Sequence, residues 1–162
     1  MTQDVHVGTD RSRIEDVYRA ESHHLRRSLL AFTSDVSIAN DALAEAFAQA
    51  ISRGPAIRNP TRWVWRAAFR IATGEMKSRP VLDTGDGTLT EPGFDMAEQS
   101  AELLAALATL PPKQRAAVVL HYLTDLPTAE VAKRLGVTST TVRVHLNHGR
   151  ARLRMILEEH DE

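Results

Sequence analysis

The feature that most constrains the fold of this chain is a pair of short amphipathic segments, joined by only three residues, towards its C-terminal end. The segments span residues 127–135 and 139–153, and Gly136, Val137 and Thr138 separate them. Gly136 can adopt the positive φ that a tight turn between crossed helices requires, and Thr138 can cap the second helix. This pattern predicts a helix-turn-helix, a motif whose second helix enters the major groove of DNA in many proteins.

The second segment is expected to bury one face and to expose another. Apolar or small residues recur at helical spacing and should face a core: Val142, Leu146, Gly149 and Leu153. The residues expected to face or flank a DNA groove are Thr138, Ser139, Thr140, Arg143, Val144, His145, Asn147 and Arg150. Guanidinium, hydroxyl and carboxamide groups form hydrogen bonds with base edges and phosphates. The alternative interpretation is an ordinary solvent-exposed helix face.

Charge is segregated along the chain, although the formal net charge is only −1. Residues 11–79 contain twelve Lys and Arg against seven Asp and Glu, and residues 110–154 contain eight against two. Residues 80–109 hold six acids and no basic residue. Two positive blocks favour a polyanionic partner, because neutralising its phosphates releases counterions.

Apolar periodicity predicts helices in both positive blocks and no strands. Breaks are expected at residues 33–37, 54–60, 79–80 and 111–112. Polar residues, glycine or proline interrupt the periodicity at each of them. The predicted architecture is all-α, with a helical domain at 11–79, a flexible acidic linker at 80–97, and a second helical domain at 98–157 that contains the helix-turn-helix.

Three stretches of the sequence carry a resemblance to a known family. Residues 110–154 read LPPKQRAAVVLHYLTDLPTAEVAKRLGVTSTTVRVHLNHGRARLR. They look like region 4 of the extracytoplasmic-function sigma factors of bacterial RNA polymerase, without a gap. Residues 41–47, DALAEAF, resemble the region 2 helix that grips the polymerase, and residues 61–68, TRWVWRAA, resemble its promoter-melting helix. The resemblance extends over residues 14–154.

The resemblance implies a dissociable initiation subunit that binds the β and β′ subunits of core polymerase, recognises promoter DNA and helps to open it. In that family, region 4 reads the −35 element in duplex DNA, and region 2 reads and melts the −10 element. Asp41 and Glu45 would meet the polymerase. The side chains that would meet the −10 element are Arg58, Asn59, Arg62, Trp65, Arg66 and Arg70. An inhibitory anti-sigma factor is a further implied partner.

Helical spacing adds two expectations for residues 61–70. Arg62 begins a stripe of three arginines at four-residue intervals, which suits one DNA strand or a solvated face. Trp63 falls with other apolar residues and is expected in the core. Trp65 falls off that face, so it would either stack on an unpaired base or pack under a loop.

The composition excludes several classes of function. Without cysteine, the chain has no disulfide, thiolate metal site or cysteine nucleophile. No apolar run approaches the roughly 20 residues of a membrane span, and no secretory signal is seen, so we expect a cytoplasmic protein. We expect neither an enzyme nor a cofactor, because no phosphate-binding glycine loop, nucleophile elbow or metal triad is present.

The histidines of the last segment allow one modest hypothesis. His145 and His148 lie one turn apart, but no acid or cysteine joins them, so we expect no metal site. Protonation of His145 could instead strengthen DNA binding at low pH.

Two alternatives to the sigma-factor interpretation stay open. The first is a stand-alone helix-turn-helix regulator, which would dimerise and bind an operator without polymerase. The second is a degenerate relative that binds polymerase or a regulator but no longer melts DNA. Departures from the family pattern keep the second open: Ala44, Ile51, Val144 and His145. Gly149, where alanine is usual, is expected to weaken its helix by about 1 kcal/mol.

Overall fold

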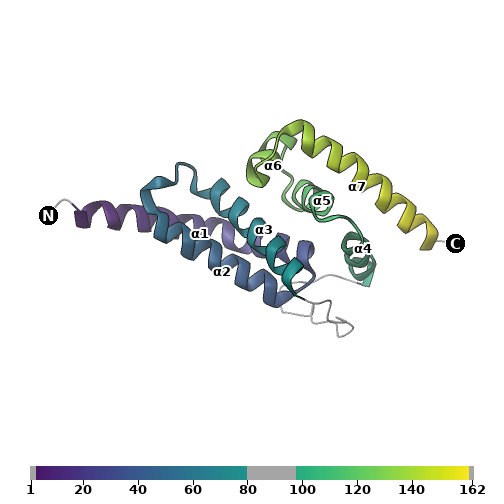
Figure 1. Cartoon of the computed structure of the whole chain (residues 1–162), viewed down its shortest axis with the longest axis horizontal. Helices are drawn as coiled ribbons and strands as arrows, with labels where there is room; N and C mark the ends of the chain where they lie inside the picture. The colour runs from purple at the N-terminus through teal and green to yellow at the C-terminus, as the bar shows by residue number, and fades with distance from the viewer. Residues whose placement is uncertain (1–2, 80–97, 161–162) are drawn as a thin grey trace.

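The computed structural model describes residues 3–79 and 98–160, with side chains placed for residues 10–79 and 101–159. All elements within these residues are helical, so the predicted all-α fold is confirmed. The elements are α1 (Gln3–Thr33), α2 (Val36–Arg53), the 3-10 helix η1 (Gly54–Ala56), α3 (Pro60–Ser78), α4 (Glu98–Ala108), α5 (Pro112–Thr124), α6 (Thr128–Leu135) and α7 (Ser139–His160). Figure 1 shows α1–α3 in one half of an elongated molecule and α4–α7 in the other. The predicted linker, residues 80–97, lies outside the described residues.

Capping residues explain the helix boundaries in the first half. After α1, Ser34 has a φ of 54°, in the left-handed region. The next residue, Asp35, accepts a hydrogen bond from the amide of Ile38 at 3.0 Å and so caps α2. Asn59 caps α3 in the same way, accepting from the amide of Arg62 at 3.1 Å. The breaks predicted at residues 33–37 and 54–60 are therefore confirmed.

The core of the first half forms where α1, α2 and α3 pack together. The buried side of α2 carries a stripe of small residues: Ala39, Ala42, Ala46 and Ala50. Such short side chains allow the neighbouring helices to approach α2 closely. Larger rings belong to the same core: Trp65 stacks on Phe69 with ring centroids 6.3 Å apart, and Phe69 meets Phe32 of α1 at 5.0 Å.

In the second half, α6 and α7 form the predicted helix-turn-helix. Gly136 has a φ of 73°, and the amide of Val137 donates to the carbonyl of Ala132 at 3.0 Å. The hydroxyl of Thr138 accepts from the amide of Thr141 at 3.2 Å and caps α7. The turn residue and the capping residue are both as predicted.

The inward face of α7 also follows the prediction. Val142, Leu146 and Gly149 are buried, and Leu153 is half-buried. A Cβ placed on Gly149 would lie 2.7 Å from Cγ2 of Val118 in α5. The glycine therefore has a packing role, because it lets α7 approach α5 closely.

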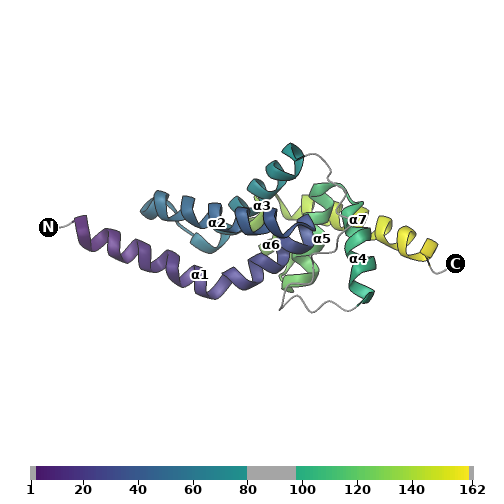
Figure 2. The same ribbon diagram turned by 90° about the horizontal axis from the view of Figure 1, so that it is seen from below.

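The two halves pack against one another. Buried residues of both belong to one continuous hydrophobic cluster. The C-terminal part of α1 meets α5 and α4, and α3 meets α6, as both ribbon views show (Figure 2). At this junction the Arg115 guanidinium donates to the carbonyls of Phe32, Ala108 and Leu110 at 3.0, 3.0 and 2.9 Å, and burial lowers the pKa of Arg115. The chain thus has two halves but one shared core, while the predicted domain boundaries stay a prediction.

Candidate nucleic-acid-binding surfaces

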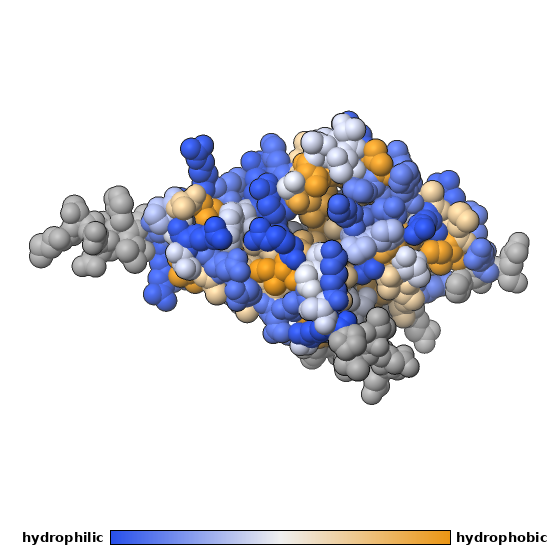
Figure 3. Space-filling model, viewed as in Figure 1, coloured by the Kyte–Doolittle hydropathy of each residue, from blue (hydrophilic) through white to orange (hydrophobic). Residues whose placement is uncertain are grey.

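The N-terminal half of α7 presents a polar face to solvent. Thr140, Arg143, Val144 and Asn147 are exposed, and Ser139 is half-buried in the first turn. Hydrophilic residues predominate on the side of the molecule seen in Figure 3, with hydrophobic ones in separate patches. The donors expected to face a DNA groove are therefore accessible, and their contact with DNA stays a prediction.

His145 differs from these neighbours because it faces the first half. It is half-buried and borders a cavity of about 500 Å³ between the halves, together with Arg66, Arg70 and Lys113. Burial, and then the charges of Lys113 and His148, lower the pKa of His145. Protonation of His145 therefore needs a more acidic solution than that of a free histidine. Its effect on DNA binding stays a prediction.

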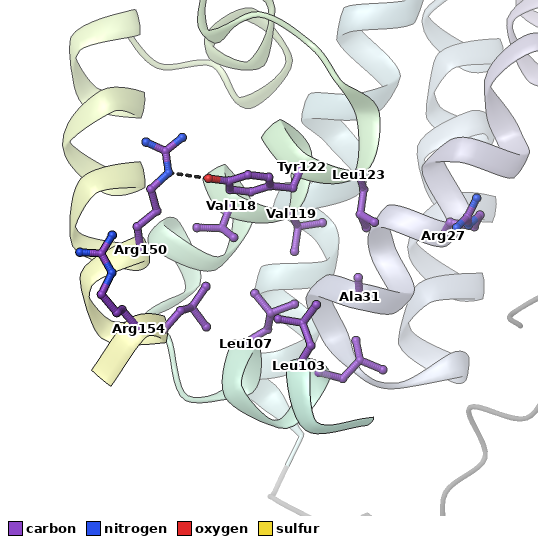
Figure 4. A pocket seen from close by; sticks show the side chains of 12 residues that line it. Arg27, Ala31, Leu103, Leu107, Val118, Val119, Tyr122, Leu123, Arg150 and Arg154 are labelled. Atoms are coloured by element: carbon purple, nitrogen blue, oxygen red, sulfur yellow. Dashed lines mark hydrogen bonds between the residues drawn. The ribbon is translucent and has the colours of Figure 1, made fainter. Parts of the chain in front are cut away.

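Arg150 lies two turns beyond Arg143 and is engaged within the protein. Its Nε donates to the hydroxyl of Tyr122 at 2.6 Å, and its guanidinium carbon lies 5.4 Å from the centre of that ring. Figure 4 shows both side chains at the edge of an apolar cavity of about 460 Å³, which residues of α1, α4, α5 and α7 line. Arg150 thus borders this apolar cavity and lies away from the exposed donors in the N-terminal half of α7.

The first arginine of the α3 stripe faces α6. Nε and Nη2 of Arg62 donate to the two carboxylate oxygens of Glu130 at 3.1 and 2.9 Å. These hydrogen bonds are the main cause of a raised pKa for Arg62 and a lowered pKa for Glu130. Both groups are therefore charged, and the guanidinium fork of Arg62 is directed at a carboxylate.

The other two arginines of the stripe are both exposed, but they differ in their contacts. Nη2 of Arg66 donates to the carbonyl of Lys133 at 3.1 Å. A Cβ on Gly136 would lie 2.8 Å from Nε of Arg66, so the turn of the helix-turn-helix sits directly against this side chain. Arg70, one helical turn further along, is exposed at the edge of the 500 Å³ cavity.

Of the two tryptophans of α3, Trp63 packs against the core as predicted, whereas Trp65, predicted to lie off the core face, is the more deeply buried. Trp65 is completely buried, at 0% exposure, and its indole Nε1–H donates to Oε2 of Glu21 at 3.0 Å. Trp63 is only half-buried, and Arg53 lies over its ring at 5.6 Å. The physical reason is that α3 is covered on two sides, by α1 and α2 and also by α6, so that its buried face is wider than one apolar stripe. In this conformation Trp65 is not accessible to a base.

Arg58 and Asn59 lie between η1 and α3. Arg58 is exposed, whereas the side-chain oxygen of Asn59 already accepts the capping hydrogen bond from the amide of Arg62. A contact of either residue with the −10 element stays a prediction.

The predicted polymerase-binding acids lie on the exposed side of α2. Asp41 pairs with Arg79 at 3.2 Å, and Glu45 accepts a hydrogen bond from Gln49 at 2.9 Å. Ion pairs with this much exposure are weak and exchange readily for other partners. The two residues of α2 that depart from the family pattern, Ala44 and Ile51, border a cavity of about 640 Å³ between α1 and α2.

Sequence reasoning missed the charged residues that join the halves. Arg134 of α6 lies with Nη1 3.5 Å from Glu21 and with Nε 3.4 Å from Glu130. Its guanidinium carbon lies 4.8 Å from the centre of the Trp65 ring. The one available signal was Glu130 itself, one of two acids among eight basic residues in 110–154. Its partner Arg62 lies 68 residues away in sequence, so no local pattern connects them.

Comparison with known proteins identifies relatives along almost the whole chain. Residues 100–153 match the family model described as sigma-70, region 4. The RNA polymerase sigma-E factor of Streptomyces coelicolor is 31% identical over 154 residues, which cover 91% of this chain and 87% of that protein. The ECF RNA polymerase sigma factor SigM of Mycobacterium tuberculosis is 28% identical over 162 residues, which cover 94% of this chain and 81% of that protein.

A solved structure agrees with these relatives in fold. The sigma factor RpoE, solved in complex with the anti-sigma factor NepR from Bartonella quintana, matches with a TM-score of 0.68 at 18% identity, over 91% of this chain and 95% of that chain. The helix-turn-helix, the α3 stripe and the sequence relatives lead to one conclusion. The chain belongs to the sigma-70 family of RNA polymerase sigma factors, in its extracytoplasmic-function group.

Proposed function

We propose that this sigma factor binds core polymerase through α2 and reads its promoter with two separate helices. The outer face of α7 contacts the −35 duplex, and the arginine stripe of α3 contacts the −10 strand. Asp41 and Glu45 meet a basic surface of the polymerase, which supplies the catalysis of RNA synthesis. As a member of its family, the chain directs the initiation of transcription.

The exposed polar face of α7 is the observation that carries this proposal. Thr140, Arg143 and Asn147 project from the first two turns, while Val142 and Leu146 anchor the opposite side in the core. A recognition helix needs this division, because the scaffold must hold it rigidly while its donors reach the groove.

The proposed partners are core polymerase, promoter DNA and an inhibitory anti-sigma factor, and the proposed location is the cytoplasm. The support for an anti-sigma partner is the neighbour from Bartonella quintana, which was solved bound to one. Within the described part of the chain, no helix combines the length and apolar character needed to cross a membrane.

The decisive test is run-off transcription with purified core polymerase on a promoter library. We expect transcripts from a small set of promoters only when the chain is added. Binding to core without any start site would refute the proposal and favour the degenerate relative. Binding of the free chain, as a dimer, to a palindromic DNA site would instead favour the stand-alone regulator.

The role of α7 is tested by comparing two arginines on the same helix. Arg143→Ala should weaken promoter binding by the holoenzyme roughly tenfold, the order expected for one good contact with a base. Arg152→Ala removes the same charge from an exposed position about two and a half turns away and should have a much smaller effect. Equal losses for the two variants would contradict recognition by the outer face of α7.

One observation favours the degenerate relative as a second candidate. Trp65 is buried and Arg62 is paired with Glu130 of α6, so these two side chains meet DNA only after α6 moves away. Permanganate footprinting of unpaired thymines in the holoenzyme–promoter complex separates the candidates. Reactive thymines around the −10 element are expected, and their absence at a promoter that is bound would support the second candidate.

A further inference from the structure

Basic side chains surround the cavity of about 500 Å³ between the two halves. We propose that this cavity is a binding site for a small ligand that combines phosphate groups with an apolar part, of the class of nucleoside diphosphates. The basic residues come from three helices, α3, α5 and α7, and we refer to them as the basic cavity cluster: Arg66, Arg70, Lys77, Lys113 and His145. The inference goes beyond the proposed function, because the ligand is a free small molecule and not promoter DNA.

The first argument is the charge of the cavity. Four of its lining residues carry a permanent positive charge, and none of the described residues that line it carries a carboxylate. Arg70, Lys77 and Lys113 form no ion pair with the described part of the chain, unlike Arg62, which is paired with Glu130. Like charges around one cavity repel one another, and a ligand with two phosphate groups would turn this repulsion into attraction.

The second argument is the size and the floor of the cavity. Its volume lies within the roughly 300–1,000 Å³ that is usual for small-molecule sites. Its lining includes apolar side chains from three helices: Phe69 of α3, Leu135 of α6 and Val142 of α7. A nucleoside diphosphate matches both parts, because its base can cover the apolar lining while its phosphates meet the basic cavity cluster. Inorganic phosphate alone would leave the apolar lining uncovered.

The N-terminus of α5 adds donors to the cluster. Pro112 and Lys113, the first two residues of this helix, line the cavity. The N-cap residue is Pro111, and no side chain caps the free amides of the first turn. Free amides at the start of a helix, and the helix dipole, attract phosphate groups. This end of α5 strengthens the basic cavity cluster and is not a site of its own.

The other occupant to consider is the DNA backbone. Arg66 and Arg70 are also proposed contacts of the −10 strand. Lys113, on α5, lies outside the residues proposed to contact either promoter element, although it lines the cavity. Dependence on Lys113 therefore separates a ligand in the cavity from a strand bound along α3.

Isothermal titration calorimetry of the whole chain with ADP and with GDP tests the site, without DNA or polymerase. We expect one nucleotide per chain, with a dissociation constant of roughly 10–100 µM. Lys113→Ala should weaken binding roughly tenfold, because a charged donor to a phosphate is lost. If neither nucleotide binds, the proposal is wrong. An oligothymidine that binds through Lys113 in that case would assign the basic cavity cluster to DNA.

The matched control is Arg152→Ala, which removes one positive charge from an exposed position on α7 outside the cavity. It should leave nucleotide affinity unchanged. Equal weakening by Lys113→Ala and Arg152→Ala would show general attraction to a basic protein and would refute a defined site.

Two fragments of ADP test the two parts of the ligand. Inorganic pyrophosphate has the phosphates without the apolar part, and adenosine has the reverse. Each should bind at least roughly tenfold more weakly than ADP, because each contacts only one part of the cavity. Pyrophosphate that binds as tightly as ADP would overturn the assigned class of ligand.

His145 reports where the nucleotide lies. Burial, and then the charges of Lys113 and His148, lower its pKa in the free chain. Phosphates bound within the basic cavity cluster favour the protonated imidazole, so saturating ADP should raise the pKa of His145 in an NMR titration of its ring signals. The ring signals of His23, exposed on α1, should not respond to ADP. An unchanged titration of His145 in the presence of bound ADP would place the nucleotide elsewhere and refute the site.

Failure of this site and failure of the proposed function give different results. A chain that directs run-off transcription but binds neither nucleotide keeps the proposed function and loses only the ligand site. A chain that binds ADP through Lys113 but yields no transcripts with core polymerase keeps the ligand site and loses the proposed function.

Discussion

The outer face of α7 and the arginine stripe of α3 are both rich in donors suited to DNA, but they differ in accessibility. Thr140, Arg143 and Asn147 are exposed on α7, whereas Arg62 of α3 is paired with Glu130 and Trp65 beside it is fully buried. The difference is caused by α6, which packs on α3 and leaves the outer face of α7 uncovered. Residue type and spacing therefore identify a surface that suits DNA, but not whether its donors are already in use.

Truncation of a side chain on the covered side of α3 should cause the largest loss of stability. Trp65→Ala removes a fully buried indole that packs between Phe69 and Arg134. We expect the free energy of unfolding to fall by about 3–5 kcal/mol, as for other large cavities. Urea denaturation followed by circular dichroism measures the loss. Trp63→Ala, at a half-buried position, should cost less than half as much, and equal losses would contradict the difference in burial.

The junction between the halves gives the next largest effect. Arg115→Ala leaves the carbonyls of Phe32, Ala108 and Leu110 without their shared donor. We expect a loss on the order of 2 kcal/mol in thermal or urea unfolding, because the carbonyls of the buried residues Phe32 and Leu110 lose a charged partner. Arg115→Lys keeps the charge but not the planar fork, so it should rescue only part of the loss. Full rescue would show that charge alone holds the junction.

A substitution at Gly149, on the inner face of α7, should change stability less, and in the direction opposite to that expected from helix propensity. Gly149→Ala gains about 1 kcal/mol in propensity but places a methyl 2.7 Å from Val118, and overpacking costs about 1–3 kcal/mol. We expect a net loss of about 1 kcal/mol in urea denaturation. Val118→Ala combined with Gly149→Ala should relieve the clash, so that the double variant loses less than the sum of the single ones. A more stable Gly149→Ala protein would contradict the close packing of α5 and α7.

The smallest effect on stability is expected for His145, which lies between the outer face of α7 and the arginine stripe of α3. The pKa of His145 is lowered in the folded chain, so the unfolded chain takes up this proton first as the pH falls through about 6.5. Stability should fall in that window, because burial and the charges of Lys113 and His148 disfavour the protonated form of His145 in the folded chain. Thermal unfolding between about pH 7 and about pH 5.5 should show a shallower decline for His145→Gln than for the wild type. His23→Gln, at an exposed position on α1, should decline like the wild type.

Much of the fold could be predicted because helix ends depend on local chemistry. Asp35 and Asn59 cap the helices that follow them, and Gly136 occupies the left-handed turn expected of it. The error at Trp65 has a long-range cause. Periodicity identifies one apolar stripe per helix, but α3 is buried on a second side by residues of α6 that lie far away in the sequence.

The sequence alone determined the helices, their caps, the helix-turn-helix and the basic surfaces, because each depends on residues within a few helical turns. Only the tertiary structure decided which donors are free. The pairing of Arg62 with Glu130 and the burial of Trp65 under Arg134 join residues more than 60 positions apart. Such contacts arise when two helical surfaces meet, and their geometry depends on packing that no local pattern encodes.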